Sequence, residues 1–370
     1  MILRNLSLTN FKNIAQASLA FSPKVNCLLG NNGMGKSNLL DAIYFLSFTK
    51  SYARVPDSML IRRGESFGIA RGTYTRAGTE EEITAGLRQG ARKSFRRGGK
   101  EYKRMSAHIG LFPAVMIAPA DLELVHGASD ERRRFADMII SQSDPAYLEA
   151  VIRYTQALEQ RNRLLRDGAT DRILFDSLEM MMDMSADAIR RGRIRFTERL
   201  SDIFMRYYSQ LSGSGECPGL RLDISGAGHD SLTDALEHAR ARDTILKYTT
   251  VGPHRDDIDF TLDDMPLRRT ASQGQTKTFT VALRFAQYHF LAELSPVKPL
   301  LLLDDIFDKL DADRVERIIS LVSHDNFGQI FITDTNRKHL DEIMDAIGGD
   351  YRMWNVAGGE FNLICDHETG

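Results

Sequence analysis

The chain has 370 residues, of which 42% are hydrophobic, and its formal net charge is −2, so any nucleic-acid binding must come from local basic patches. The longest apolar run, at residues 300–303, is far too short for a transmembrane helix. The N-terminus lacks the apolar stretch of a secretory signal. Three widely spaced cysteines form neither a metal-binding pattern nor a disulfide framework, so we expect a cytoplasmic protein.

The first fifty residues predict strands, a glycine loop and a helix, in that order. Ile2–Thr9 and Ala15–Phe21 partly alternate apolar and polar residues, as paired strands do, and Val25–Leu29 is a short buried strand. Residues 38–48 carry apolar side chains at helical spacing. Between strand and helix, residues 30–37 read GNNGMGKS and match G-x-x-x-x-G-K-[ST], the pattern of a phosphate-binding P-loop.

The middle of the chain changes in character. Short strands and glycine turns are predicted from residue 67 to 104, with a hairpin at RRGGKEYKR, and a buried strand follows at Pro113–Pro119. Three charged, glycine-poor segments then have helical periodicity, with Asp130 and Asp144 as N-caps: Asp130–Gln142, Pro145–Arg166 and Asp171–Leu211.

Strands and helices alternate again from about Asp256 to the end. We therefore expect an α/β unit interrupted by a compact, mostly helical lobe, with helices too short and broken for a long coiled-coil arm. The expected domains are an N-terminal ATPase part at 1–125, a helical insertion at 126–242, and a C-terminal ATPase part at 243–370.

The P-loop pattern predicts that the chain binds the phosphates of ATP or a close relative, with Mg²⁺. Glycines let successive backbone N–H groups curl around phosphates, and the following helix directs its positive end at them. Lys36 reaches the β and γ phosphates, and the Ser37 hydroxyl ligates Mg²⁺. The expected nucleotide contacts in the loop are Gly30, Asn31, Asn32, Gly33, Met34, Gly35, Lys36, Ser37 and Asn38.

An acidic partner for the P-loop follows the apolar strand at residues 300–303. Asp304 suits control of Mg²⁺, and Asp305 suits polarisation of the attacking water, so Lys36, Asp304 and Asp305 are the candidate catalytic residues. The alternative is a strand that simply ends in an acidic turn. Kinases and small GTPases keep the two motifs much closer in sequence, so the separation points to the ABC and SMC branch of P-loop proteins.

The segment TASQGQTK at Thr270–Lys277 precedes a strong helix. A serine and a glycine at a helix start provide a second phosphate site, although ordinary helix N-caps have the same composition. Its position shortly before the acidic strand matches the order of an ABC signature. Asp311, just after the carboxylates, is similar to the D-loop aspartate of that class.

Several motifs together resemble the RecF family, bacterial recombination-repair ATPases related to the SMC proteins. They are GNNGMGKSNLLDAIYFLS, LTNFKN, VGPHRDDIDF, SQGQTK, LLLDDIFDKLD and APADLELVHGASDERRRFAD, and they cover nearly the whole chain in order. The resemblance implies an α/β fold of the ABC-type P-loop ATPase head, with an inserted helical lobe. VGPHRDD is its most discriminating part, and no catalytic role for it follows from its composition.

The resemblance also implies a function. RecF-like proteins bind ATP, form an ATP-dependent homodimer, and bind double-stranded DNA near single-strand gaps. With RecO and RecR they assist RecA loading in DNA repair, replication and the SOS response, and slow, DNA-stimulated hydrolysis releases them. Lys12 is expected near the phosphates. The signature residues expected to act in trans on the partner's nucleotide are Ser272, Gln273, Gly274 and Gln275.

The chain departs from the general ABC pattern in three ways. Asp305 stands where most ABC proteins have Glu, which fits slow hydrolysis. The expected histidine switch is absent, with Thr333 or Asp334 near its place, and His339 is interpreted as an ordinary surface residue. No convincing Q-loop glutamine is present near residues 118–124.

Basic residues outnumber acids eight to one between Arg88 and Arg104. Long basic side chains reaching phosphates give affinity without sequence readout, although charge runs are usually solvated faces. Further basic clusters occur at residues 132–134 and 190–195. The candidate DNA contacts are Arg92, Lys93, Arg96, Arg97 and Lys100.

Other classes remain open. One is a transporter-type ABC subunit, which the helical insertion and VGPHRDD disfavour. Another is a nucleotide kinase or the ATPase domain of an anti-phage defence system. A third is a different SMC-like or ABC-type ATPase subunit without preference for DNA gaps.

Overall fold

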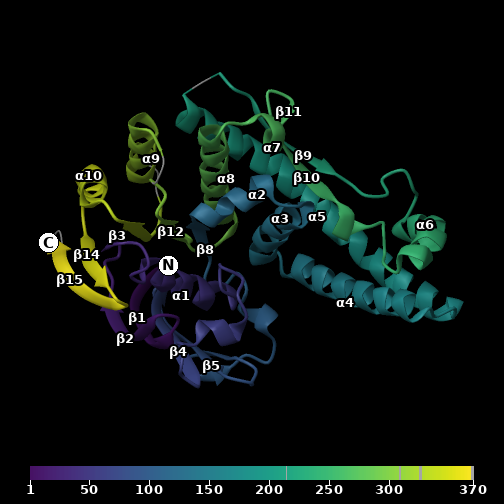
Figure 1. Cartoon of the computed structure of the whole chain (residues 1–370), viewed down its shortest axis with the longest axis horizontal. Helices are drawn as coiled ribbons and strands as arrows, with labels where there is room; N and C mark the ends of the chain where they lie inside the picture. Colours follow the sequence, from purple (N-terminus) through teal and green to yellow (C-terminus); the bar gives the residue numbers. More distant parts are fainter. Residues whose placement is uncertain (214, 308–309, 325–326, 368–370) are drawn as a thin grey trace. The chain divides into compact units, whose positions relative to one another are not determined.

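The computed structural model describes residues 1–213, 215–307, 310–324 and 327–367, and the chain forms two compact units (Figure 1). Unit 1 comprises Met1–Asp121, Gln210–Ser212 and Arg284–Gly370, and unit 2 comprises Leu122–Ser209 and Gly213–Leu283. The three-part division expected from the sequence stays a prediction. Residues 243–283, expected with the C-terminal ATPase part, lie within unit 2.

Unit 1 contains an antiparallel six-stranded sheet in the order β2-β1-β4-β5-β6-β7. The predicted pairing of the first two strands and the predicted RRGGKEYKR hairpin are both confirmed, since β6 pairs with β7 across two glycines with φ of 54° and 77°. The strands are β1 (Ile2–Phe11), β2 (Ile14–Ala20), β4 (Phe67–Arg76), β5 (Thr79–Arg88), β6 (Ser94–Arg97) and β7 (Lys100–Glu101).

The second sheet of unit 1 has the order β15-β14-β3-β13-β12-β8 and is parallel except at β15. Its strands β8, β12 and β13 are buried along their whole length, as expected where a parallel sheet is covered on both faces. The strands are β3 (Val25–Leu29), β8 (Ala114–Ile117), β12 (Leu300–Asp304), β13 (Ile330–Asp334), β14 (Tyr351–Ala357) and β15 (Glu360–His367).

Helix α1 (Lys36–Phe48) contacts strands of both sheets, β1, β4 and β5 on one side and β8, β12 and β13 on the other. Because it lies between two apolar surfaces, 11 of its 13 residues are buried. Helix α10 (Arg337–Ile347) packs on β3 and β13 and contacts α9 (Ala312–His324). Short 3₁₀ turns occur at Asp57–Leu60, Met105–His108 and Pro119–Leu122.

Unit 2 is mostly helical and includes a three-stranded sheet in the order β11-β10-β9. Helix α8 runs from unit 2 into unit 1, and α5 ends on residues of unit 1. The helices are α2 (Glu123–His126), α3 (Ser129–Ser143), α4 (Pro145–Asp167), α5 (Arg172–Ser212), α6 (Leu232–Leu246), α7 (Leu267–Thr270) and α8 (Gln273–Leu294). The strands are β9 (Pro218–Asp223), β10 (Asp257–Leu262) and β11 (Met265–Pro266), and a 3₁₀ turn lies at Pro253–Arg255.

The three helices predicted for the insertion are present, with two corrections. Asp144 caps α4 by accepting a hydrogen bond from the Tyr147 N–H, as predicted, whereas α3 begins at Ser129 and Asp130 lies in its first turn. Helix α5 nearly matches the predicted segment Asp171–Leu211, but its 41 unbroken residues, about 60 Å at 1.5 Å per residue, are longer and more continuous than the reasoning against a coiled-coil arm assumed. Among the described residues, no helix combines the length and apolar character that a bilayer span requires.

Buried arginines organise the interior of unit 2. Arg161 is fully buried and forms ion pairs with Glu179 at 2.9 Å and Asp243 at 2.7 Å. Arg193 pairs with Asp137 at 3.0 Å and Asp256 at 2.8 Å. Each guanidinium is therefore neutralised by two carboxylates contributed by other elements, which is the condition for burying a charge.

These contacts explain the VGPHRDD segment. Asp256 is buried and also accepts a hydrogen bond from the Ser225 N–H, while Asp257 pairs with Arg132 at 2.8 Å. The His254 ring lies between the Tyr154 hydroxyl (2.7 Å) and the Thr249 carbonyl (3.1 Å), and burial lowers the pKa of His254 to about 4. The segment joins α3, α4 and α5 of unit 2, so its chemistry here is structural.

Candidate nucleotide site

Residues 30–35 connect β3 to α1 and have the backbone of an anion-binding loop. A Cβ at Gly30 would lie 2.3 Å from the Val356 carbonyl oxygen of β14, and Gly35 has a φ of 118°, so both positions require glycine. Among the described residues, no side chain caps α1 and no acid lies in its first turn. The positive end of α1 is therefore directed at the loop.

Lys36 is folded over this loop. Its ammonium donates hydrogen bonds to the carbonyls of Gly30 (2.6 Å) and Asn31 (3.2 Å), and it lies 3.9 Å from Asp305 Oδ1. Only 3% of the side chain is exposed. The predicted loop cation and one of the predicted acids thus lie in the same site.

The serine that ends the P-loop pattern contacts the acid that ends β12. Ser37 Oγ donates a hydrogen bond to Asp304 Oδ1 at 2.8 Å, although the two residues are 267 positions apart. Burial raises the pKa of Asp304 to about 6, despite hydrogen bonds from Ser37 and Thr333. A hydroxyl beside a carboxylate is a set of hard oxygen ligands that fits Mg²⁺.

Thr333 holds the two acids in place. Its hydroxyl donates to Asp304 Oδ1 at 2.8 Å, lies 3.3 Å from Asp305 Oδ1, and accepts a hydrogen bond from the Asp305 N–H at 3.0 Å. Asp305 has a φ of 44°, a left-handed conformation that costs a non-glycine residue of the order of 1 kcal/mol or more. The sequence placed Thr333 near a missing histidine switch, and the structure shows it positioning the carboxylates.

The turn between β1 and β2 also reaches the site. Lys12 forms an ion pair with Asp41 of α1 at 2.5 Å, so its ammonium is held against the helix that follows the P-loop. The next residue, Asn13, accepts a hydrogen bond from the Asn38 side chain at 2.8 Å, and its side chain lies 3.1 Å from where a Cβ of Gly35 would be. Asn13 was missed because an asparagine in a turn has no pattern of its own.

The turn between β14 and β15 supports the loop from another direction. Gly359 donates its N–H to the Met34 carbonyl at 2.8 Å. Asn31, Asn32 and Gly33, by contrast, are exposed at the loop tip. Gly359 is 325 positions from Met34, and nothing in the local sequence predicts that they meet.

His339 differs from its interpretation as an ordinary surface residue. Its Nδ1 lies 2.9 Å from Asp334 Oδ2, and its ring centroid lies 5.6 Å from that of Phe307, just after the two acids. The carbonyl of Asp334 accepts the Gly30 N–H at 3.3 Å. His339 is therefore part of a chain of contacts that ends at the first P-loop residue.

The predicted D-loop is only partly described, because residues 308 and 309 lie outside the described part of the chain. Asp311 is described, and its Oδ1 accepts a hydrogen bond from the Arg314 N–H at 2.9 Å in the first turn of α9. Its local role is therefore that of a helix cap.

The signature segment forms a capping box at the start of α8. Ser272 Oγ accepts a hydrogen bond from the Gln275 N–H (3.2 Å), and Gln275 Oε1 accepts one from the Ser272 N–H (2.7 Å). The Gln275 amide also donates to Glu216 at 2.8 Å. Ser272 and Gln273 are exposed, and Gly274 and Gln275 are partly exposed. The helix-cap interpretation is thus correct locally and leaves the helix end accessible.

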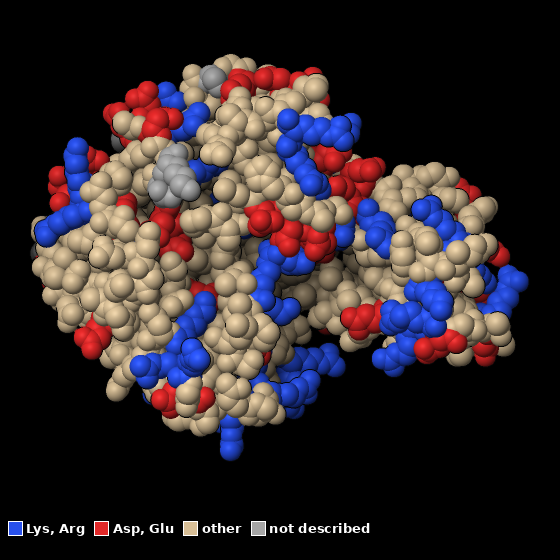
Figure 2. All heavy atoms as spheres, in the orientation of Figure 1, with Lys and Arg blue, Asp and Glu red and all other residues tan. Residues whose placement is uncertain are grey.

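The basic candidates divide into two groups. Lys93 binds the Thr49 carbonyl (2.6 Å) and Asp57 (3.0 Å), and Arg97 pairs with Glu81 (2.6 Å), so both hold neighbouring strands and turns together. Figure 2 shows basic side chains in separate groups with acidic ones between them. The exposed members of the predicted set are Arg92, Arg96 and Lys100.

Comparison with known proteins agrees with this geometry. The model of the RecF/RecN/SMC N-terminal domain matches residues 2–353. The "DNA replication and repair protein RecF" of Parabacteroides distasonis is 51% identical over 97% of this chain and 98% of its own length. That of Bacteroides fragilis is 50% identical over 100% of both chains.

A solved structure described as the recombination mediator protein RecF-ATP in the RecFOR pathway is also similar. It superposes with a TM-score of 0.89 at 26% identity, covering 98% of each chain. The expected α/β ATPase-head fold is confirmed. The chain therefore belongs to the RecF/RecN/SMC family and, within it, to the RecF proteins of DNA replication and repair.

Proposed function

We propose that the P-loop of this chain binds ATP with Mg²⁺ and that hydrolysis is slow. The observation that carries the proposal is the contact between Ser37 Oγ and Asp304 Oδ1 at 2.8 Å, with Lys36 3.9 Å from Asp305. Ser37 and Asp304 would hold Mg²⁺, which neutralises phosphate charge, and Lys36 would leave its loop carbonyls for the β and γ phosphates. The similar structure described as RecF-ATP supports the nucleotide.

Asp305 acts as the residue that orients and polarises the attacking water. The Asp305 side chain is 27% exposed, so solvent reaches it, and the hydrogen bond between its N–H and Thr333 fixes its position. The shorter aspartate, in place of glutamate, places the carboxylate further from the γ phosphate. This supports hydrolysis that works as a switch rather than as rapid turnover.

ATP closes a homodimer in which residues 272–275 of one copy contact the nucleotide of the other, with Asp311 near the junction. The capped but accessible N-terminus of α8 supports this, because its first N–H groups and its dipole favour a phosphate. The dimer binds double-stranded DNA near single-strand gaps, RecR and RecO are its partners, and RecA loading is the outcome. The setting is the bacterial cytoplasm.

The composite site is tested by two variants of the full chain. Lys36→Met removes the phosphate-binding charge and abolishes ATP-dependent dimerisation in size-exclusion chromatography. Ser272→Arg leaves ATP binding by the monomer intact and blocks dimerisation and hydrolysis. A mixture of the two variants regains hydrolysis, because one of its two composite sites is intact. If Ser272→Arg alone hydrolyses ATP at the normal rate, action in trans is wrong.

DNA preference is tested by measuring binding, with and without ATP, to gapped duplex, intact duplex and single strands of equal length. The proposal expects ATP to increase the affinity for the gapped duplex most. Equal affinity for all three would support an SMC-like subunit without gap preference. A chain that binds ATP, stays monomeric and phosphorylates a nucleotide would be a kinase.

A further inference from the structure

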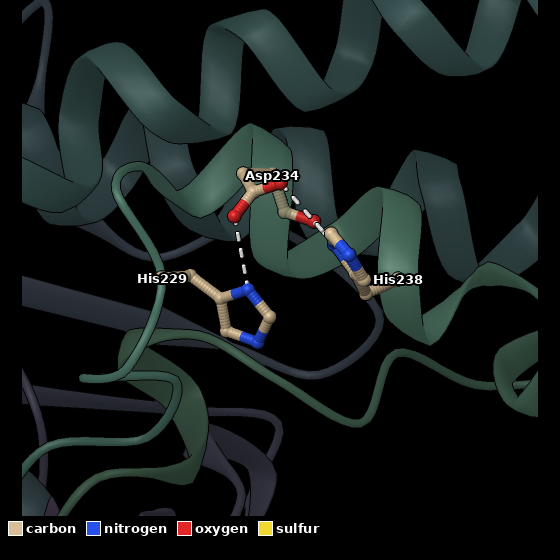
Figure 3. A group of neighbouring side chains, drawn as sticks. All are labelled: His229, Asp234 and His238. Carbon is tan, nitrogen blue, oxygen red and sulfur yellow. Dashed lines mark hydrogen bonds and ion pairs between the residues drawn. The ribbon is translucent and has the colours of Figure 1, made fainter.

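Two histidines and an aspartate converge at the N-terminal end of α6 in unit 2 (Figure 3). His229 lies in the loop before the helix, and Asp234 and His238 lie one turn apart on it. His229 Nδ1 is 3.0 Å from Asp234 Oδ2, and His238 Nδ1 is 3.2 Å from Asp234 Oδ1. The two imidazole centroids are 5.0 Å apart, on either side of the carboxylate.

The spacing fits a single transition-metal ion. One ligand atom from each residue can be chosen so that all three lie within 4.8 Å of one another. A tetrahedral Zn²⁺ ion with ligands at about 2.0–2.2 Å separates those ligand atoms by about 3.3 Å. The nitrogen–oxygen distances of 3.0 and 3.2 Å are close to that value but end on the two different oxygens of Asp234, so the side chains rotate to bring one oxygen and both nitrogens around the ion.

The ligand types select the class of ion. Imidazole nitrogen suits Zn²⁺ and its neighbours among the transition metals, whereas Mg²⁺ and Ca²⁺ prefer sites made of oxygen. Two histidines and one carboxylate form an open three-ligand set, in which water completes the coordination. We propose that His229, Asp234 and His238 bind Zn²⁺ at the surface of unit 2.

The backbone around the site is already ordered. Ser231 caps α6 by accepting the Asp234 N–H at 3.0 Å, and the Leu232 N–H is bound by Asp183 at 2.8 Å. The His229 N–H is bound by the Gly226 carbonyl at 3.2 Å. Since loop and helix start are held before any ion arrives, binding mainly orders side chains.

Binding exchanges protons and hydrogen bonds for metal bonds. The Nδ1 of His238 lies 2.9 Å from the Asp234 carbonyl of the preceding turn, and this contact is given up when the nitrogen ligates. The histidine side chains are 32% and 67% exposed, so an ion reaches them from solvent. Once bound, Zn²⁺ ties the loop containing His229 to the first two turns of α6.

The test is a Zn²⁺ titration of the metal-free full chain, without nucleotide, in competition with a chromogenic chelator. The parent is expected to bind one Zn²⁺. The double variant His229→Ala, His238→Ala should lose affinity more than about tenfold, since changes even outside the ligand shell cost 10–100-fold. Unchanged affinity in the double variant overturns the proposal.

Two controls keep the result specific. His289→Ala is the first control. His289 Nε2 lies 3.6 Å from Glu293, four residues further along the helix, which is the same spacing as between Asp234 and His238. This variant should bind Zn²⁺ as the parent does. Cys217→Ser removes the exposed cysteine and should also leave binding unchanged. If Cys217→Ser abolishes the binding, the ion is held by thiolate and the proposal is wrong. Far-UV circular dichroism verifies that each variant is folded.

Discussion

Asp304 is expected to destabilise the fold while it serves the nucleotide site, and Asp304→Asn tests this. The residue is 6% exposed, and burial raises the pKa of its carboxyl from 3.8 to about 6. That difference corresponds to roughly 3 kcal/mol of unfavourable free energy for the ionised form. Asparagine keeps an oxygen to accept from Ser37 and Thr333 but adds an N–H₂ group needing a partner. We therefore expect a gain of about 1–3 kcal/mol in the free energy of unfolding without nucleotide.

The gain depends on pH with a definite sign. Because the folded carboxyl binds its proton more tightly than the unfolded one, the parent is stabilised as the pH falls from about 6 to 4. The asparagine variant has no such proton to bind. The advantage of Asp304→Asn is therefore full above about pH 6 and vanishes by about pH 4.

The assay is urea denaturation of the nucleotide-free chain at pH 7.5 and pH 4.5, followed by tryptophan fluorescence. Trp354 is the single tryptophan, it is buried in β14, and its ring lies 5.4 Å from that of Phe21, so it reports on unit 1, which contains Asp304. Asp345→Asn, an exposed position on α10, is the matched control and should change little. A less stable Asp304→Asn at pH 7.5, or a gain as large at pH 4.5 as at pH 7.5, would refute the reasoning.

Three further predictions test other parts of the molecule. Asp305→Asn should bind ATP normally, and its ATP-bound dimer should persist longer in size-exclusion chromatography, because the water that attacks the γ phosphate is no longer polarised. A normal rate of ATP hydrolysis would contradict this. The double variant Arg96→Ala, Lys100→Ala should bind duplex DNA with a weaker salt dependence. The slope of log affinity against log salt concentration should fall by about 0.9 for each phosphate contact that is lost. Arg97→Ala is the control and should leave this slope unchanged, because Arg97 pairs with Glu81. Arg193→Met removes the cation that pairs with buried Asp256 and with Asp137, and it should cost about 3 kcal/mol in thermal unfolding followed by far-UV circular dichroism, because the Asp256 carboxylate stays buried without its ion-pair partner. A cost below about 1 kcal/mol would contradict this.

The sequence alone predicted the features set by local rules. The P-loop needs glycines at particular backbone angles and a lysine and a hydroxyl at fixed spacing, so residues 30–37 were recognisable without any partner. The buried strands β3, β8 and β12 were equally plain from their apolar runs. The order of motifs also led to the RecF family, which the comparisons confirmed.

Only the tertiary structure decided which distant residues meet. Thr333 pairs with Asp304 because β12 and β13 are neighbours in parallel register, and no local pattern fixes that pairing. The same holds for Gly359 behind the P-loop and for His339 against Asp334. The basic clusters were misleading for the same reason. In the sequence Arg97 and Arg193 look like free charges, whereas in the structure Arg97 pairs with Glu81 and Arg193 with Asp137. A backbone motif is local, whereas the burial and partners of a charge depend on how the whole chain packs.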